Sequence, residues 1–210
     1  AFILPALLVI LGLVAYPFVM AIYLSLTDAW VGSEGNFIGF QNYSDLVQND
    51  IFQQTLKNSL LFTFFSVTAK TVLGMALALL LNAKIRFQRI FRGAILLPWV
   101  IPDTMSTLGW LWMFDPTFSV LNWVLTHGGL IQTNVSWLSN PYWAMFSIIT
   151  VNVWRGLPFF AITLLAGLVS VPQELYKAAH IDGAGAMRCF FRITLPLLKP
   201  LLLIVILFST

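Results

Sequence analysis

Long apolar runs alternate with short polar links along this chain. The complete runs cover about residues 2–26, 57–83, 93–114 and 141–169, and a fifth run starts near residue 197 and continues to residue 210. At about 1.5 Å of rise per residue, each complete run can cross a hydrocarbon core roughly 30 Å thick. Inside such a core every backbone N–H and C=O must bond within its own segment, which a helix achieves. The pattern therefore predicts an all-α, polytopic membrane helical bundle that forms a single transmembrane domain over residues 1–210.

Both ends of the chain fall inside apolar runs. Ala1 opens the first run, and the last residues, LLLIVILFST, belong to the fifth. We therefore expect a bundle that is truncated at both ends. The first run is long, and it has neither a charged segment before it nor a small-residue cleavage site after it, so we expect a span rather than a signal peptide.

The composition agrees with lipid as the solvent, and the basic residues indicate an orientation. Charged residues make up 9% of the chain, whereas a soluble domain carries about 25%. The links at 84–92 and 170–199 hold eight of the eleven Lys and Arg residues, and the links at 27–54 and 115–140 hold none. Because short basic links stay in the cytoplasm, we expect the first run to lead outward and residues 170–199 to be cytoplasmic.

The first outer link contains a segment with helical character. Residues 37–53, FIGFQNYSDLVQNDIFQ, could form a short interfacial helix with Asn42 as its N-cap and with Leu46, Val47 and Ile51 on one side. An ordinary ordered loop explains the same residues equally well.

The second basic link, residues 170–196, predicts a helical elbow. Pro172 suits a first helical turn, and Glu174 places negative charge near the positive end of a helix over residues 173–181. The pair Asp182-Gly183 ends this helix, because Gly readily adopts the left-handed conformation of a C-cap. A second helix follows over residues 186–195.

The second helix of the elbow carries apolar side chains and leads into two prolines. Phe190, Phe191 and Ile193 are expected to pack against the bundle, and Pro196 and Pro200 are expected to mark the turn back into the membrane. Ala178 and Ala179, in the first helix, are small enough for a partner surface to approach closely. On physical grounds alone, the elbow could be a structural turn or a docking site.

The elbow resembles the cytoplasmic EAA motif of permease subunits in bacterial binding-protein-dependent ABC importers. The motif is Glu-Ala-Ala, three residues, Gly, nine residues and Ile-x-Leu-Pro. Here Lys177-Ala178-Ala179, Gly183 and Ile193-Thr194-Leu195-Pro196 keep every spacing. The wider wording, with FIGFQNYSDLV, RGAILLPWVIP and NVSWLSNPYWA elsewhere, looks like the maltose or multiple-sugar type. One departure is Lys177, which stands where the motif usually has Glu.

The resemblance implies a type I ABC importer transmembrane domain with a mechanical task. Such a permease works in the bacterial inner membrane with a second homologous permease, two cytoplasmic ATPases and an extracytoplasmic solute-binding protein. ATP and Mg²⁺ would bind to the ATPases, so this chain needs no cofactor of its own and no nucleic acid. The elbow would couple the ATPases to alternating access for a sugar or oligosaccharide. The implied coupling residues are Glu174, Lys177, Ala178, Ala179, Asp182, Gly183, Ile193, Leu195 and Pro196.

A few polar residues inside the apolar runs are candidates for a solute path. An ionisable side chain in hydrocarbon costs at least about 2.5–3.5 kcal/mol, so it should face the bundle interior, a water-filled path or a partner chain. Asp103 follows Pro102, where the third run should be kinked, and could pair with Lys70 or Arg155. Structural pairing and contact with a solute both remain open for these charges. The candidate residues are Lys70, Asp103, Asn152, Trp154 and Arg155.

The tryptophans have two interpretations. Six lie near predicted membrane boundaries or in outer links, where aromatic belts form: Trp99, Trp110, Trp112, Trp123, Trp137 and Trp143. Aromatic faces also pack well on sugar rings, and Trp154 is the best candidate for such a contact because of its depth in the fourth run.

Two other classes of function remain as alternatives. An ion-gradient-driven secondary transporter could use the buried charges, but an inverted repeat would be expected and none is visible. An intramembrane enzyme would need a catalytic cluster, and the sequence has neither GxxxxGK[ST] nor HExxH. His127 and His180 are far apart, so no metal site is evident, and Cys189 is expected to be a passive helix residue. We therefore expect a transport subunit and not an enzyme.

Overall fold

The computed structural model describes residues 3–33, 35–83 and 86–209. Lys84, a member of the first basic link, and the outermost residues of the first and fifth runs lie outside the described residues. Within these ranges the fold is helical, and the β-structure consists of one isolated bridge between Thr27 and Phe37. The chain divides into unit 1, Ala1–Leu60, and unit 2, Leu61–Thr210, and each is described by itself.

Unit 1 begins with a continuous apolar helix. It consists of α1 (Leu4–Ile10), the π-helical turn η1 (Leu11–Ala15) and α2 (Tyr16–Ser25). Pro17 has no N–H to donate to the preceding turn, which accounts for the irregular turn directly before it. None of the described residues of this helix is buried within the unit. A helix that is apolar all round requires lipid or other protein around it.

Of the two interpretations left open for residues 37–53, the structure selects a short helix, α3 (Gln41–Gln48), but the expected cap is wrong and Ile51 belongs to the next helix. Phe40 occupies the N-cap position and makes no side-chain capping bond. Asn42 lies inside the first turn, where its Nδ2 donates to the carbonyl oxygens of Ser25 at 3.0 Å and Thr27 at 2.8 Å. Ser25 is the last residue of α2, whose final carbonyls have no partner within the helix, so Asn42 ties the start of α3 to the end of α2 and does not cap its own helix.

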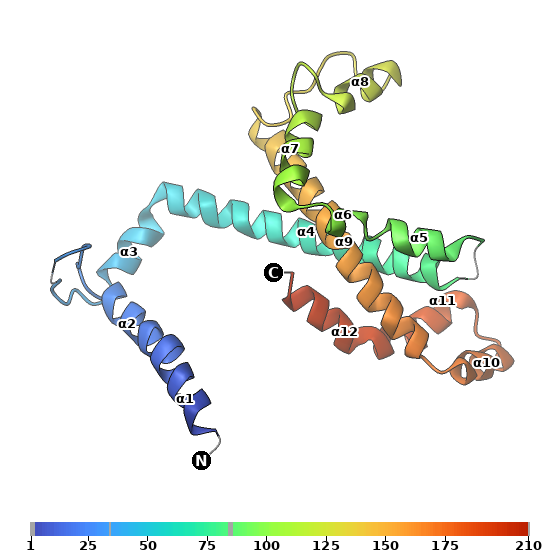
Figure 1. Ribbon diagram of the computed structural model, residues 1–210, viewed down its shortest axis with the longest axis horizontal. Helices are drawn as coiled ribbons and strands as arrows, with labels where there is room; N and C mark the ends of the chain where they lie inside the picture. Colours follow the sequence, from blue (N-terminus) through green and yellow to red (C-terminus); the bar gives the residue numbers. More distant parts are fainter. Residues whose placement is uncertain (1–2, 34, 84–85, 210) are drawn as a thin grey trace. The chain divides into compact units, whose positions relative to one another are not determined.

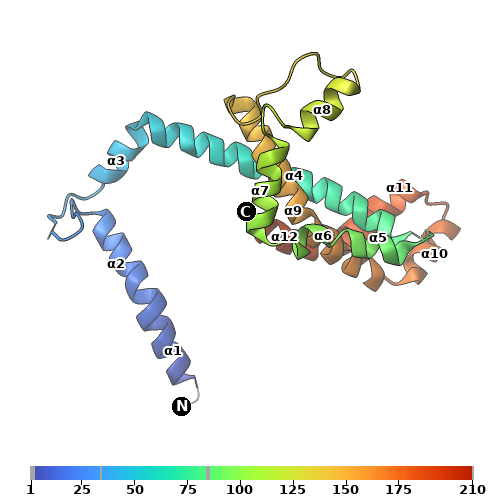
Figure 2. The same ribbon diagram turned by 45° about the horizontal axis from the view of Figure 1, so that its top comes forward.

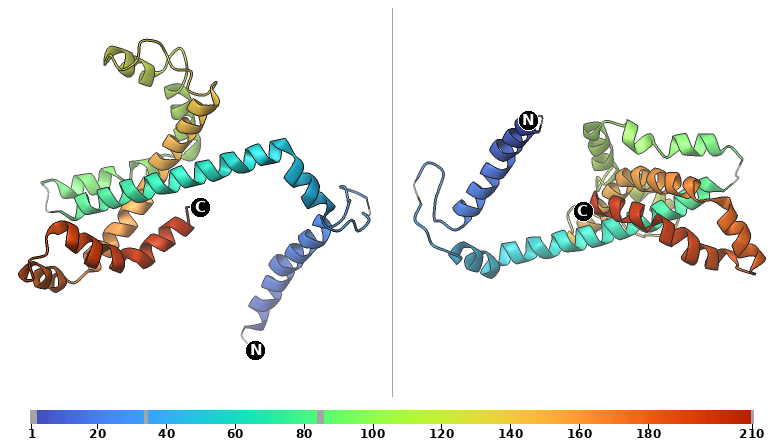
Figure 3. Two further views of the ribbon diagram at one scale, coloured as in Figure 1. Left: turned by 180° about the vertical axis from the view of Figure 1, so that it is seen from behind. Right: turned by 90° about the horizontal axis from the view of Figure 1, so that it is seen from below.

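Unit 2 is built around two long helices and a third that packs beside them. The helices are α4 (Asp50–Asn82), which starts in unit 1, α9 (Pro141–Ser170) and α12 (Leu195–Leu207). In Figures 1 and 3, α9 crosses α4 and runs next to α12. Their shared core consists of Met75, Ala78, Leu81, Leu164, Leu165, Leu168 and Leu198.

Small residues allow these helices to approach closely. A Cβ placed on Gly74 of α4 would stand 2.5 Å from the Cβ of Phe160 on α9. A Cβ on Gly167 of α9 would stand 2.4 Å from a methyl carbon of Leu201 on α12. In a membrane, where apolar burial gives little drive for association, such close packing supplies much of the attraction between helices.

The third apolar run, residues 93–114, does not form one kinked helix as expected. It contains the end of α5 (Gln88–Ala94), then α6 (Leu97–Val100) and α7 (Asp103–Met113). Pro102 forces the residue before it out of the helical region, and Ile101 accordingly has an extended ψ of 125°. The kink expected at Pro102 is therefore a complete break, which turns Asp103 into the first residue of a new helix.

The outer link at 115–140 is ordered by one buried amide. Ser119 caps α8 (Val120–His127) by accepting a bond from the backbone N–H of Asn122. The buried Oδ1 of Asn122 in turn accepts from the indole N–H of Trp137 at 3.0 Å. Trp137 is 5% exposed, so its assignment to a membrane belt is wrong, because the indole is fixed inside the link.

The elbow begins as expected and ends differently. Its first helix, α10 (Gln173–Ile181), has the predicted bounds. Its second helix is not separate, because α11 (Ala186–Cys189), the π-helical turn η2 (Phe190–Thr194) and α12 run on without interruption. Pro196 and Pro200 therefore lie inside a continuous helix and do not mark a turn. Pro196 stands in the first turn of α12, directly after η2, where its missing N–H is tolerated.

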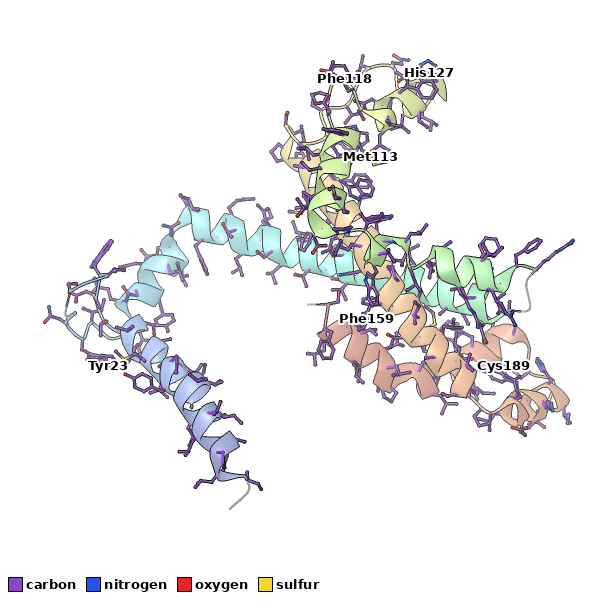
Figure 4. The ribbon with its side chains drawn as sticks, viewed as in Figure 1. Tyr23, Met113, Phe118, His127, Phe159 and Cys189 are labelled. Carbon is purple, nitrogen blue, oxygen red and sulfur yellow. The ribbon has the colours of Figure 1, made fainter. Side chains whose placement is uncertain are left out.

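The two ends of unit 2 differ in charge. The elements α5 and α10 lie at the same end in Figures 1 and 2, and α8 lies at the opposite end of α9. Figure 4 places Cys189 at the first end and Phe118 and His127 at the second. Lys and Arg residues gather on the first end, whereas residues 115–140 contain none. This polarity is the pattern that a helical bundle in a membrane needs.

Four helical stretches of the described residues are long and apolar enough to cross a membrane. They are Leu4–Ser25, Asp50–Asn82, Pro141–Ser170 and Ala186–Leu207. The last begins well before residue 197, because the amphipathic second helix of the elbow continues into the apolar run.

Substitution of Gly74 by Ala should destabilise the packing of α4 on α9. Overpacking costs about 1–3 kcal/mol, which should exceed the gain of about 1 kcal/mol from the higher helix propensity of Ala. We expect a lower Tm for the detergent-purified protein. Gly109→Ala in α7 is the matched control, since nothing lies within 4 Å of its added Cβ, and it should leave Tm unchanged or higher.

Candidate functional site

The helix α10 has two chemically different faces. Glu174, Lys177, Ala178 and Ile181 recur at helical spacing and are all exposed. Gln173, Tyr176 and His180 lie on the other side, where they line a cavity of about 640 Å³ shared with α4, α9, α11 and η2. Ala179 is half-buried between the two faces. One side of α10 is thus free to meet another molecule, while the other faces unit 2.

The end of α10 is fixed by a Schellman motif. Gly183 has a φ of +74°, and its N–H donates to the carbonyl of His180 at 3.1 Å. The N–H of Ala184 donates to the carbonyl of Ala179 at 2.8 Å. These two bonds satisfy carbonyls that the helix would otherwise leave open. The predicted stop at Asp182-Gly183 is confirmed, with the exposed Asp182 as the C-cap residue.

Side-chain bonds join α10 to the helix that follows it. The hydroxyl of Tyr176 lies 2.8 Å from Oγ1 of Thr194, which is buried in η2. The Nδ1 of His180 lies 3.0 Å from the carbonyl oxygen of Ala184. Because Thr194 directly precedes α12, α10 is linked to that helix by a hydrogen bond as well as through the chain.

The remaining residues of the motif belong to the membrane helix and not to a surface loop. Ile193 and Leu195 are half-buried, and Leu195 packs against the core of unit 2. Pro196 is exposed. Phe190 also packs on the core, whereas Phe191, which was expected to do the same, is 57% exposed. Consecutive residues of a helix point about 100° apart, so Phe190 and Phe191 do not face the core together.

A second cavity, of about 480 Å³, lies between α4, α7 and α9. Asn152 and Arg155 contribute polar groups to its wall. Phe62, Trp110 and Phe114 contribute aromatic surface. A cavity with broad apolar walls and a few convergent polar groups is the usual form of a small-molecule site.

Asp103 is paired with one of its two candidate partners. Arg155 of α9 forms a salt bridge with Asp103, the first residue of α7. Of the two partners left open for Asp103, the structure selects Arg155, because the break at Pro102 brings the start of α7 against the middle of α9. Lys70 lies apart from this pair, on α4.

The five candidate path residues are therefore divided. Asn152 and Arg155 line the cavity, and Asp103 reaches it through Arg155. Trp154 lines a different hollow with residues of α5 and α6, and its ring meets Trp110 edge-on with centroids 5.5 Å apart. Lys70 is buried and does not line the 480 Å³ cavity.

Sequence reasoning missed the aromatic lining of the cavity. For Trp110 a membrane belt was the main interpretation and a solute contact the other, and Phe62 and Phe114 carried no signal, because aromatic residues are common throughout the apolar runs. Their position depends on how α4, α7 and α9 meet. Among the described residues, no group of three His, Cys, Asp or Glu side chains could hold a metal ion.

Comparison with known proteins identifies the family. The profile described as binding-protein-dependent transport system inner membrane component matches residues 70–210. The trehalose/maltose transport system permease protein MalF of Thermococcus litoralis is 36% identical over 209 residues, which cover 99% of this chain and 70% of that protein. The chain belongs to the family of binding-protein-dependent transport system inner membrane components. It is an ABC-type permease and a multi-pass membrane protein.

Other relatives of this inner membrane component carry similar names. The sulfoquinovosyl glycerol transport system permease protein SmoG of Agrobacterium fabrum is 36% identical, over 98% of this chain and 67% of that protein. The diacetylchitobiose uptake system permease protein NgcF of Streptomyces coelicolor is 38% identical, over 89% of this chain and 56% of that protein.

A solved structure shares the fold. A chain of a bacterial ABC transporter involved in the import of the acidic polysaccharide alginate superposes with a TM-score of 0.78 at 25% identity, over 99% of this chain and 70% of that chain. The same transporter in complex with an alginate pentasaccharide-bound periplasmic protein gives a TM-score of 0.77. The all-α membrane fold expected for this inner membrane component is confirmed.

Exchange of Asp103 and Arg155 should preserve their salt bridge. Asp103→Arg and Arg155→Asp should each lower the Tm of the purified protein, and the double variant should recover at least part of the loss. Both side chains are partly exposed, so we expect a coupling of only about 0.2–1 kcal/mol. Asp45→Asn, which changes an exposed carboxylate on α3, is the control. A double variant as unstable as the sum of the single ones would contradict the pairing.

Proposed function

We propose that this chain is one permease subunit of an ATP-driven importer and that α10 is its coupling helix. The observation that carries the proposal is the geometry of α10, whose exposed face lies on a helix held by a Schellman motif and by the Tyr176–Thr194 bond. Such a helix can transmit a displacement without bending. A coupling between two sites needs this kind of stiff, discrete element more than it needs a reactive group.

The partners follow from the same arrangement. Two cytoplasmic ATPases bind ATP and Mg²⁺, and one of them receives the exposed face of α10. A second homologous permease completes the bundle and covers apolar faces that this chain leaves open. An extracytoplasmic binding protein delivers the solute at the α8 end. The complex lies in the bacterial inner membrane with residues 170–199 in the cytoplasm, which the gathering of Lys and Arg residues at the α10 end supports.

The solute is proposed to be a sugar or an oligosaccharide. The names of the relatives refer to trehalose and maltose, sulfoquinovosyl glycerol and diacetylchitobiose. The cavity beside Asn152 and Arg155 suits this class, because aromatic faces pack on sugar rings while amide and guanidinium groups bond to hydroxyls. Trp154 lines a separate hollow and contacts the ring of Trp110 edge-on. It is not part of the proposed contact surface.

The charges on the exposed face of α10 determine which residues of the ATPase can form salt bridges with it. Lys177 reverses the sign of the residue that the EAA motif usually carries at this place. Glu174 lies almost one turn earlier on the same exposed face and can supply the negative charge instead. Coupled uptake that stays unchanged in both Glu174→Ala and Lys177→Glu would show that neither charge is needed.

Cysteine crosslinking tests the docking of α10. In a Cys189→Ala background, Lys177→Cys should form a crosslink to the ATP-hydrolysing subunit, because its side chain lies on the exposed face. Leu130→Cys, at an exposed position at the opposite end of unit 2, is the control and should give none. The products are read by mass spectrometry of the purified complex.

A crosslink from residue 130 but not from residue 177 would reverse the proposed sidedness and reject the docking role. The source of energy is tested separately, since uptake in vesicles should follow ATP and should not follow the membrane potential.

The stiffness of the elbow can be tested at Gly183. Alanine in the left-handed conformation costs about 1–2 kcal/mol, so Gly183→Ala should loosen the Schellman motif and lower the number of solute molecules taken up per ATP hydrolysed. Gly185→Ala is the matched control, because Gly185 has a φ of −74° and open space around its added Cβ. Equal coupling ratios in the two variants would contradict a role for the rigid cap.

A further inference from the structure

Lys70 is buried in the membrane region of unit 2 with unusual surroundings. The side chain is 4% exposed and lies between α4 and α9. Its Nζ donates to Oδ1 of Asn152 at 2.9 Å and stands 5.9 Å from the centroid of the Phe160 ring. Among the described residues the only salt bridge is the one between Arg155 and Asp103. A neutral amide and an aromatic face therefore hold this lysine in place of a carboxylate.

The helix α9 is shaped to admit the lysine. Gly156 lies one turn beyond Asn152, and a Cβ on Gly156 would stand only 2.6 Å from Cδ of Lys70. The stem of the lysine thus crosses α9 where a side chain is missing, and this path aims the ammonium at residue 152. The position of Lys70 thus depends on glycine at 156, since any larger residue there would displace the aliphatic stem of the lysine.

The lysine determines which way the amide of Asn152 faces. An ammonium group has three donors and no acceptor, whereas an Asn amide offers one acceptor oxygen and one NH₂ group. Only the oxygen can therefore face Lys70. The NH₂ group must turn away from the lysine, and it has no acceptor among the described residues.

The side of Asn152 that turns away from Lys70 belongs to the cavity. Asn152 lines the 480 Å³ cavity together with Arg155, and Lys70 does not. With the amide fixed in this way, Asn152 presents only N–H donors to the cavity, and the guanidinium of Arg155 likewise has donors and no acceptor. The two nitrogen-bearing side chains of the wall therefore donate hydrogen bonds and accept none, whereas the hydroxyls of Thr107 and Ser147 can also accept.

We propose that Lys70 is a positioning residue for solute selection: it fixes the Asn152 amide with the NH₂ group toward the cavity, so that a solute must present a hydrogen-bond acceptor there. This inference rests on the proposed function for its solute, which is a sugar whose hydroxyl or ring oxygen accepts the bond. The Lys70–Asn152 interaction itself does not depend on the identity of the solute.

The experiment uses the complete importer complex and combines stability with transport. The variants are Lys70→Met, Asn152→Asp, Asn152→Leu and Gly156→Ala, and Lys57→Met, an exposed lysine on the same helix, is the matched control. The Tm is measured in detergent. The KM and the maximal rate of uptake are measured in proteoliposomes with radiolabelled trehalose and maltose as probes.

Asn152→Asp separates positioning from simple packing. A carboxylate keeps an acceptor for Lys70 and pairs with its charge, so the Tm should equal or exceed that of the unaltered complex. The same carboxylate has no N–H to offer the cavity, so KM should rise about tenfold, the factor that one lost hydrogen bond supplies. Asn152→Leu should lower both Tm and affinity.

Removal of the lysine should act through Asn152. Lys70→Met leaves the amide free to rotate, so KM should rise by a similar factor while the maximal rate changes little. Gly156→Ala should give the same shift without altering any charge, which keeps the test valid if Lys70→Met folds poorly. Lys57→Met should leave KM unchanged.

Three results would overturn the inference: an unchanged KM in Lys70→Met and Gly156→Ala, an unchanged KM in Asn152→Asp, or a Tm in Asn152→Asp as low as in Asn152→Leu. Failure of the unaltered complex to take up either sugar would instead reject trehalose and maltose as its solutes. The Tm values of Asn152→Asp and Asn152→Leu would then still decide whether the amide oxygen faces Lys70.

Discussion

The bilayer imposes the constraint on which this structure depends: a backbone N–H or C=O in hydrocarbon must find its partner within the protein. Long helices satisfy it in α4, α9 and the continuous stretch from α11 to α12. Places where the helix breaks are therefore informative, because protein or water must compensate there. The break at Pro102 is the main example in unit 2, and it lies beside a cavity.

The same constraint explains why Lys70, Asp103 and Arg155 each have a polar partner. Arg155 is joined to Asp103 across the break between α6 and α7, and Lys70 is joined to Asn152 across the contact of α4 with α9. Each pair links two helices and one member of each pair lines the cavity. Polar groups that the membrane makes costly are thus concentrated beside the cavity that we propose as the solute site.

At the α10 end of unit 2 the chain leaves the apolar runs, and backbone groups there can bond to water. Hydrogen bonds within the protein nevertheless hold α10 in place. The helix α10 is short and lies outside the apolar runs, so its stability depends on its cap at Gly183 and on Tyr176. The apolar core of α4, α9 and α12 begins immediately behind it. The short helix α10 is consequently connected directly to the long apolar helices of unit 2, as the proposed coupling role requires.

The sequence by itself determined the helical class, the bounds of α10 and its stop at Gly183, because these depend on hydropathy over long windows and on local backbone preferences. The spacing of the elbow motif also led to the correct family. Only the tertiary structure decided that Asp103 pairs with Arg155, that Trp137 is buried and that Pro196 lies within a helix. It also revealed the aromatic lining of the cavity. These features depend on which helix faces which, and that is decided by contacts between residues far apart in the chain, such as Gly74 with Phe160 and Lys70 with Gly156.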